Sequence, residues 1–269
     1  MVSNNLLYAF LITLFAGLST GIGSALAVFT KKTNTKFLSF ALGLSAGVMI
    51  YISFVELFPQ AIELISDTAP RQAELYTALA FFVGIAVIFV IDMIIPDADN
   101  PHELHKVEDM QKSQNSHALR RLGIITAVAI AIHNFPEGIA TFSTAMVSLE
   151  LAIPIAVAIA IHNIPEGIAV SIPIYYATGS RKKAFWLSLL SGMAEPIGGL
   201  FGFLLLRQFL DSFGLGIIMA TVAGIMVYIS VDELLPGAEK YGQHHYAIVG
   251  FIVGMAIMAM SLLMLGVSL

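Results

Sequence analysis

Long apolar stretches alternate with polar segments along almost the whole chain. A helix needs about 20 predominantly apolar residues to cross a bilayer, and eight stretches reach that length. The pattern predicts an all-α membrane protein with eight transmembrane helices, forming a single transmembrane domain over residues 1–269. The predicted helices cover roughly residues 6–30, 37–62, 75–95, 122–143, 151–177, 184–207, 215–238 and 246–267.

Composition agrees with a protein embedded in a lipid bilayer. The chain is 58% hydrophobic and 12% charged, with a mean hydropathy of +0.87, whereas about 25% of the residues of a soluble domain are charged. The formal net charge of −5 is small and indicates no nucleic-acid partner. There are no cysteines, which excludes disulfides and thiolate metal sites. The apolar run after Met1 lacks a basic start and a cleavage site, which favours a membrane helix over a signal peptide.

Lys and Arg fall mainly on one side of the predicted helices. The connections at 31–36, 96–121, 178–183 and 239–245 hold eleven of them, and the other side holds two. Since cytoplasmic loops carry the excess of positive charge, these four connections are predicted to be cytoplasmic and both termini extracytoplasmic.

One of these connections is long. Residues 96–121 are polar and include His102, His105 and His117, and we expect a flexible cytoplasmic loop. Its acidic and histidine-containing start permits two interpretations, a loose metal-binding segment or an ordinary solvated loop.

The second and seventh predicted helices share a sequence. Residues 45–61 and 222–238 are identical at ten of seventeen positions. These two helices cross the membrane in opposite senses because they are five apart, and the fourth and fifth are likewise matched and opposed. This is typical of an inverted repeat, here in a 3+2+3 arrangement, and substrate sites are expected near the repeat axis.

A polar motif occurs twice inside apolar helices. The run Ala-Val-Ala-Ile-Ala-Ile-His-Asn-x-Pro-Glu-Gly-Ile-Ala begins at Ala127 and again 29 residues later at Ala156. Ionisable groups are costly inside a membrane and mark functional sites there. The polar residues are His133, Asn134 and Glu137 in the first copy and His162, Asn163 and Glu166 in the second.

These residue types suit a divalent metal. In each copy the His and Glu lie four residues apart and share a helix face, and the proline between them frees backbone carbonyls, which a membrane tolerates only around a cavity. Two imidazoles and two carboxylates favour Zn²⁺, Fe²⁺, Mn²⁺, Co²⁺ or Cd²⁺ over Ca²⁺ and Mg²⁺. The asparagines, about 100° around the helix, could serve a second ion, with the glutamates bridging and Glu195 as an extra carboxylate. For a single His or Glu the alternative is a hydrogen-bonded group that tunes helix packing.

Polar residues also mark the ends of the second and seventh helices. In the predicted orientation Glu56 lies toward the outside, and Asp232 and Glu233 lie toward the cytoplasm. Acidic groups at both ends of a path suit the capture and release of a cation, although each could be an ordinary interfacial charge. The candidate pathway residues are Ser53, Glu56, Ser230, Asp232 and Glu233.

The doubled His-Asn-x-Pro-Glu-Gly motif, the Glu195-Pro196 pair and the eight-helix plan resemble the ZIP (Zrt/Irt-like) family of metal transporters, in particular its bacterial ZupT type. The resemblance covers nearly the whole chain. It implies a multi-pass importer of divalent metals in the bacterial inner membrane, acting as a homodimer, with no organic cofactor and no enzymatic activity. The long loop departs from some members of the family, because it has three scattered histidines in place of a dense histidine tract.

The resemblance also implies a binuclear centre between the fourth and fifth helices. The transported ions would be zinc, with iron, manganese, cobalt and cadmium, and helices 2, 4, 5 and 7 would slide against the other four. The first ion would be held by His133, Glu137, His162 and Glu166, and the second by Asn134, Glu137, Asn163, Glu166 and Glu195.

Two other functions fit some of the same residues. A zinc site with a bound water could serve an intramembrane metal-dependent hydrolase, but the symmetric ligands offer no asymmetric open position. A metal-stabilised scaffold would bind metal without moving it. Metal flux into proteoliposomes, compared with lipid or peptide cleavage, separates the three.

Overall fold

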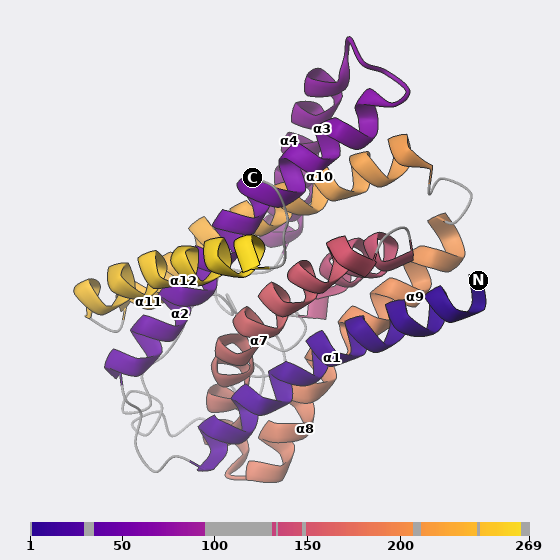
Figure 1. Ribbon diagram of the computed structural model, residues 1–269. Coiled ribbons are helices and arrows are strands. Elements are labelled where there is room, and N and C mark those ends of the chain that lie inside the picture. The colour runs from indigo at the N-terminus through magenta and orange to yellow at the C-terminus, as the bar shows by residue number, and fades with distance from the viewer. Residues whose placement is uncertain are drawn as a thin grey trace.

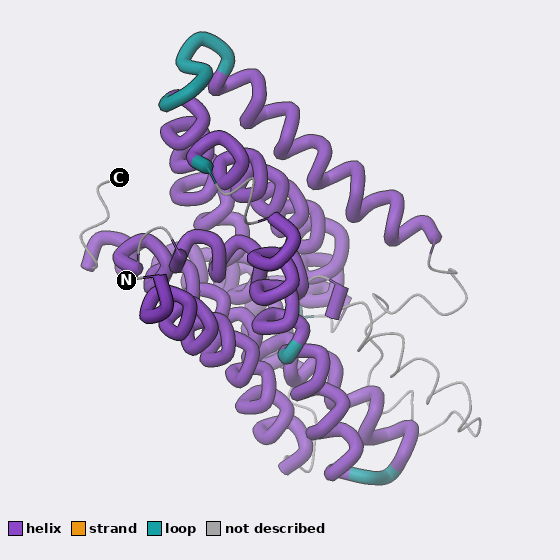
Figure 2. Tube along the Cα trace, turned by 90° about the vertical axis from the view of Figure 1, so that its right-hand side faces the viewer, coloured by secondary structure: helices purple, strands orange, loops and turns teal. Residues whose placement is uncertain are grey.

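The computed structural model describes residues 2–29, 35–94, 131–132, 134–146, 149–206, 211–240 and 243–264, and every regular element in them is a helix (Figures 1 and 2). The segment 134–146 is helical. The other elements are α1 (Val2–Phe29), α2 (Thr35–Ile52), the π-helical η1 (Ser53–Leu57), α3 (Phe58–Ser66), α4 (Ala73–Ile94), α7 (Leu149–Thr178), α8 (Arg181–Gly192), α9 (Ala194–Leu206), α10 (Ser212–Ile229), the π-helical η4 (Ser230–Leu234), α11 (Leu235–Lys240) and α12 (His244–Met264).

Seven helical stretches within the described residues are long and apolar enough to cross a membrane. Several combine consecutive elements: α2, η1 and α3 form Thr35–Ser66, and α8 and α9 form Arg181–Leu205. Residues 122–130 and 133 of the predicted fourth helix, 122–143, and the whole loop 96–121 lie outside the described residues. For the part of the chain that is described, the all-helical prediction is confirmed.

Local sequence sets several helix ends. The Ser180 side chain caps α8 by accepting a hydrogen bond from the Lys183 backbone N–H at 3.3 Å, and Asp211 caps α10 by accepting from the Gly214 N–H at 2.8 Å. Such caps satisfy backbone donors that the first helical turn leaves open. Gly179, with φ at 62°, ends α7 in the left-handed region that glycine adopts without strain.

The helices pack in two groups. In the first, α1 lies against α7, α8 and α9, and α7 lies against α8. In the second, α2 lies against α12, and α10 lies against α4 and α3 (Figure 1). The segment 134–146 belongs to the first group because Gly138 packs directly on the backbone of Glu195 in α9. Contacts between α2 and α7 join the two groups.

Glycines allow close helix crossings in the second group. A Cβ atom at Gly47 of α2 would overlap the Phe251 carbonyl of α12, and one at Gly224 of α10 would overlap the Phe81 carbonyl of α4. Small residues at such crossings let membrane helices meet backbone to backbone. Gly47 and Gly224 are corresponding positions of the repeated sequence, so the same type of crossing is made twice.

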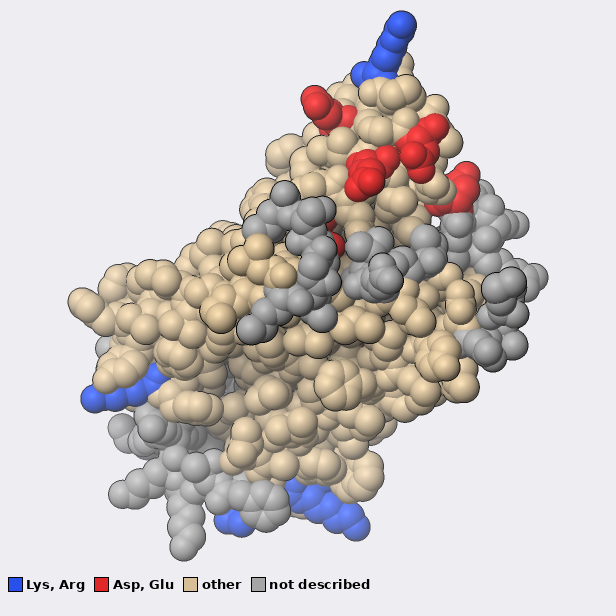
Figure 3. Space-filling model, viewed as in Figure 1, with Lys and Arg blue, Asp and Glu red and all other residues tan. Residues whose placement is uncertain are grey.

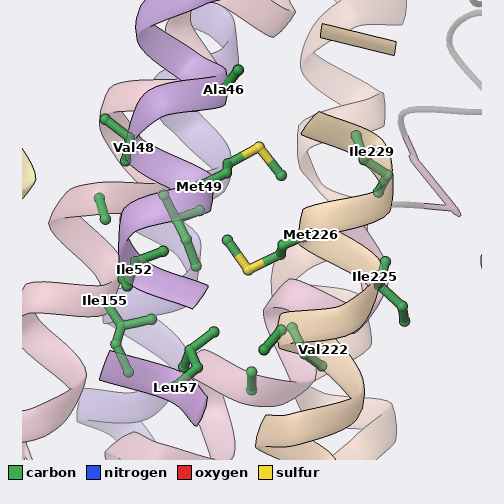
Figure 4. Close-up of a cluster of buried hydrophobic side chains, with 14 of the residues drawn as sticks. Ala46, Val48, Met49, Ile52, Leu57, Ile155, Val222, Ile225, Met226 and Ile229 are labelled. Carbon is green, nitrogen blue, oxygen red and sulfur yellow. The ribbon is translucent and has the colours of Figure 1, made fainter. Parts of the chain in front are cut away.

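The repeated stretches of α2 and α10 run antiparallel beside each other, and the side chains of Met49 and Met226, which also correspond, point toward one another (Figure 4). Each helix then passes into its π-helical segment. There Ser53 Oγ donates to the Met49 carbonyl and Ser230 Oγ donates to the Met226 carbonyl, both at 2.7 Å. π-Helical turns are rare overall, and those that occur are often at functional sites. Their occurrence at matched positions makes both segments candidates for a functional role.

Charged side chains lie at the two ends of the molecule. On the face shown in Figure 3, Lys and Arg gather where α2 and α8 begin, and Asp and Glu gather near the turn between α3 and α4, together with one basic side chain. The visible surface between the ends carries few charged side chains on this face, and α1, α4 and α12 expose large hydrophobic side chains such as Phe15, Phe82 and Ile252. This is the surface that a multi-pass membrane protein requires.

Candidate metal centre

Six of the seven predicted metal ligands lie in the described residues, and each of the six is at most 1% exposed. The seventh, His133, lies outside the described residues. A buried polar or charged group needs a hydrogen-bonding, ionic or metal partner, since it is otherwise strongly destabilising. The buried six are Asn134 and Glu137 in the segment 134–146, His162, Asn163 and Glu166 in α7, and Glu195 in the first turn of α9.

The two copies of the polar motif meet side by side. His162 Nε2 of α7 lies 3.3 Å from Glu137 Oε2 of the neighbouring segment. The motif prolines leave these elements helical, since α7 continues through Pro165 and the segment 134–146 through Pro136. No three His, Asp or Glu side chains among the described residues converge on a position for a metal ion. Without His133 the predicted ligand set is therefore incomplete.

Asn163 links α7 to two other helices. Its Nδ2 donates to the Ala16 carbonyl of α1 at 2.9 Å and to Glu195 Oε1 of α9. Asn163 Oδ1 and Glu195 Oε2 are buried and have no hydrogen-bond partner among the described residues. A buried oxygen without a partner costs about 1–3 kcal/mol, and a bound cation would remove that cost.

Asn134 makes the matching contact on the other side. Its Nδ2 donates to the Ser191 carbonyl of α8 at 3.4 Å, and its buried Oδ1 has no partner within the described part of the chain. The amide groups of both asparagines are thus held by backbone carbonyls of a neighbouring helix, which leaves both carbonyl oxygens available to a ligand.

The backbone contacts of the two motif copies also come in matched pairs. A Cβ at Gly138 would overlap the Glu195 carbonyl, and a Cβ at Gly167 would overlap the Thr20 carbonyl. Likewise Gly198 of α9 packs on the Phe135 carbonyl, and Gly23 of α1 packs on the Ile164 carbonyl. In each pair, one contact is made by the first copy of the motif and the equivalent contact is made by the second copy.

One alignment accounts for all of these pairs. Residues 16–24 of α1 match residues 191–199 of α8 and α9, so that Thr20 corresponds to Glu195. Gly17 and Gly192 correspond and pack against each other. The sequence signal for this match is a shared Gly followed five residues later by Ile-Gly, which is too little to find without the contacts.

The candidate pathway residues lie in the two π-helical segments. Ser53 and Glu56 of η1 and Ser230 of η4 are buried, whereas Glu233 is half-buried and Asp232 is exposed. In the antiparallel arrangement of Figure 4, η1 and η4 lie on opposite sides of the facing methionines. The structure therefore places Glu56 on one side of these methionines and Asp232 and Glu233 on the other.

Comparison with known proteins gives a consistent result. The family model described as "ZIP Zinc transporter" matches residues 3–92 and 96–262. Curated relatives named zinc transporter ZupT include that of Chlorobium phaeovibrioides, 58% identical over 97% of this chain and 99% of the relative. Those of Clostridium perfringens (55% identical; 97% of each chain) and Streptococcus mutans (54% identical; 98% of this chain and 99% of the relative) are similar over the same extent. The resemblance seen in the sequence is confirmed, and the chain belongs to the ZIP zinc transporter family.

Proposed function

We propose that the protein imports zinc across the bacterial inner membrane into the cytosol. The observation that carries this proposal is the contact between His162 and Glu137, two buried ionisable side chains from matched motifs on adjacent membrane helices. Such groups face one another inside a membrane where they bind an ion or a proton. The relatives' name, zinc transporter, supplies the substrate.

The proposed centre holds two ions. His133, Glu137, His162 and Glu166 bind the first, and Asn134, Asn163 and Glu195 bind the second with both glutamates bridging. The buried oxygens of Asn134, Asn163 and Glu195, which have no hydrogen-bond partner in the described residues, support the second position. Mixed nitrogen and oxygen ligands extend the proposal to Fe²⁺, Mn²⁺, Co²⁺ and Cd²⁺. These metals are cargo, and no organic cofactor is proposed.

We further propose that the chain is a 3+2+3 inverted repeat with both termini outside. The matched contacts of α1 and α9, the facing Met49 and Met226, and the paired π-helical segments support this symmetry. In this orientation zinc enters near Glu56, reaches the centre and leaves past Asp232 and Glu233. The functional unit is proposed to be a homodimer.

The packing favours a different moving unit from the one that the family resemblance implied. Helices 2 and 7 of that scheme are α2 and α10, which are tied by glycine crossings to α12 and α4. The helices of the metal centre, 134–146 and α7, are tied by glycine crossings to α9 and α1. We propose that α1, 134–146, α7, α8 and α9 move together against the second group, across the contact between α2 and α7.

Zinc uptake into proteoliposomes tests the proposal. A zinc-sensitive dye inside the vesicles should report uptake by the wild type and none above background for Glu137→Ala or Glu166→Ala. Glu74→Ala, which removes an exposed carboxylate at the start of α4, is the matched control and should transport normally. Normal uptake by either centre variant would contradict the assignment, and lipid or peptide cleavage without zinc flux would favour the hydrolase instead.

A further inference from the structure

Three buried threonines of the described helices, Thr20 in α1, Thr77 and Thr141, have hydroxyls with no hydrogen-bond partner among the described residues, whereas other helical threonines bond to their own helix. Thr13, Thr144 and Thr221 each donate to the carbonyl four residues earlier, at 2.8–2.9 Å. This is the usual solution for a hydroxyl inside a helix. Thr20 is fully buried, and its Oγ1 has no hydrogen-bond partner among the described residues.

The carbonyl that Thr20 would use is already occupied. The Ala16 carbonyl, four residues before Thr20, accepts from Ser19 Oγ at 2.6 Å and from Asn163 Nδ2 at 2.9 Å. The carbonyl that the Thr20 hydroxyl would use is thus bonded by Asn163, which is a predicted metal ligand.

Thr20 also occupies a distinctive position. It corresponds to Glu195 in the alignment that pairs α1 with α8 and α9, and Gly167 packs on its backbone as Gly138 packs on that of Glu195. Thr20 Oγ1 lies 2.6 Å from the place where a Cβ on Gly192 would stand. Gly192 follows Ser191, whose carbonyl accepts from Asn134. Thr20 and Asn134 thus both contact the last turn of α8, at Ser191 and Gly192. The corresponding residues Glu195 and Asn163 are hydrogen-bonded to each other.

We propose that the Thr20 hydroxyl binds the second ion at its Asn134 side, opposite the Glu195 carboxylate. This rests on the proposed zinc transport and adds a ligand to that site. The second ion is then held by matched groups of unequal charge: a carboxylate from α9 and a neutral hydroxyl from α1. A neutral oxygen contributes most to ions that prefer oxygen ligands, such as Mn²⁺, and least to softer ions such as Cd²⁺.

Metal selectivity is the property that separates a ligand from a packing residue. Zinc uptake into proteoliposomes is measured with Mn²⁺ or Cd²⁺ as the competitor, and the two inhibition constants are compared. Thr20→Val, which keeps the shape and removes the hydroxyl, should weaken inhibition by Mn²⁺ about fivefold or more relative to Cd²⁺, the size of one lost polar contact. Thr20→Ser should restore the wild-type ratio. Thr13→Val, a buried threonine of the same helix whose hydroxyl is bonded, should leave the ratio unchanged.

Several results would overturn the inference. These are an unchanged ratio in Thr20→Val, an equal weakening of both inhibitors, or a wild type that Mn²⁺ does not inhibit. If Thr20→Val does not reach the membrane, Thr20→Ala removes the hydroxyl without adding bulk and is judged by the same ratio. Wild-type vesicles that take up no zinc would refute the proposed function itself, whereas normal zinc uptake with an unchanged ratio refutes only the role of Thr20.

Discussion

The carboxylates of the proposed metal centre differ in the neighbours that hold them. Glu137 lies against the imidazole of His162, whereas one oxygen of Glu195 accepts from the Asn163 amide and the other has no hydrogen-bond partner within the described residues. In the proposed centre Glu137 contacts both ions and Glu195 contacts one. Loss of Glu195 should therefore weaken zinc binding without abolishing transport.

Two substitutions of Glu195 distinguish the effect of its negative charge from the effect of its hydrogen bond to Asn163. Glu195→Gln keeps an oxygen for the Asn163 amide but removes the negative charge, and should raise the KM for zinc uptake about tenfold, or about 1.4 kcal/mol. Glu195→Ala removes both and should raise the KM further, because it also leaves the buried Asn163 amide with one acceptor fewer. Transport kinetics over a range of zinc concentrations measure both, and an unaltered KM in Glu195→Gln would exclude the carboxylate from the second ion position.

The residue types of the site are readable in the sequence, and their partners are not. The His, Asn and Glu residues of the doubled motif can be recognised as candidate site residues from the sequence, because such groups are unfavourable and rare in apolar membrane helices. Each of the two asparagine amides donates to a backbone carbonyl, Asn163 to that of Ala16 and Asn134 to that of Ser191. Any residue supplies a carbonyl, so no residue type marks these partners in advance. Thr20 is hidden for the same reason, since a lone threonine in a membrane helix is ordinary.

At the scale of elements, crossings between glycine and a backbone carbonyl determine which helices pair. Gly84 of α4 packs on the Thr221 carbonyl of α10, and Gly224 of α10 packs on the Phe81 carbonyl of α4. Each of the two helices therefore contributes one glycine that packs on a backbone carbonyl of the other. Each contact brings the backbones closer than any side chain would permit, which strengthens packing where water supplies no hydrophobic driving force.

A single methyl group should disturb this crossing. Gly84→Ala forces α4 away from α10 and should destabilise the protein by about 1–3 kcal/mol, the usual cost of overpacking. Ala86→Val adds bulk on the exposed side of the same helix and should have little effect. Thermal unfolding of the purified proteins in detergent compares the two. Equal melting temperatures for Gly84→Ala and the wild type would show that the crossing is not tightly packed.

The elements themselves are only partly predictable. Apolar runs of about 20 residues give the membrane helices, because length and hydropathy suffice for that. The π-helical turns η1 and η4 and the break between α8 and α9 at Met193 depend on local hydrogen bonding that a hydropathy pattern does not carry. The division into two packed groups depends on glycines that touch carbonyls far away in the sequence, so neither hydropathy nor helix order predicts it.

At the scale of the whole molecule, the proposed orientation in the membrane rests on the separation of charge. Basic side chains gather where α2 and α8 begin, and acidic side chains gather around the turn between α3 and α4 (Figure 3). A cytoplasmic basic end agrees with the rule that positive loops remain inside. In the proposed orientation the acidic end faces the medium from which zinc is taken.

The absence of native cysteines makes this orientation directly testable. Gln72→Cys, exposed beside the turn between α3 and α4, should react with a membrane-impermeant maleimide in intact cells, or in spheroplasts if the organism has an outer membrane. Lys182→Cys, exposed in the first turn of α8, should react only after the membrane is permeabilised. Each variant serves as the control for the other, because both thiols are accessible in detergent. The reverse pattern would place the basic end outside, and the acidic residues of η4 would then form the entrance of the path and Glu56 its exit.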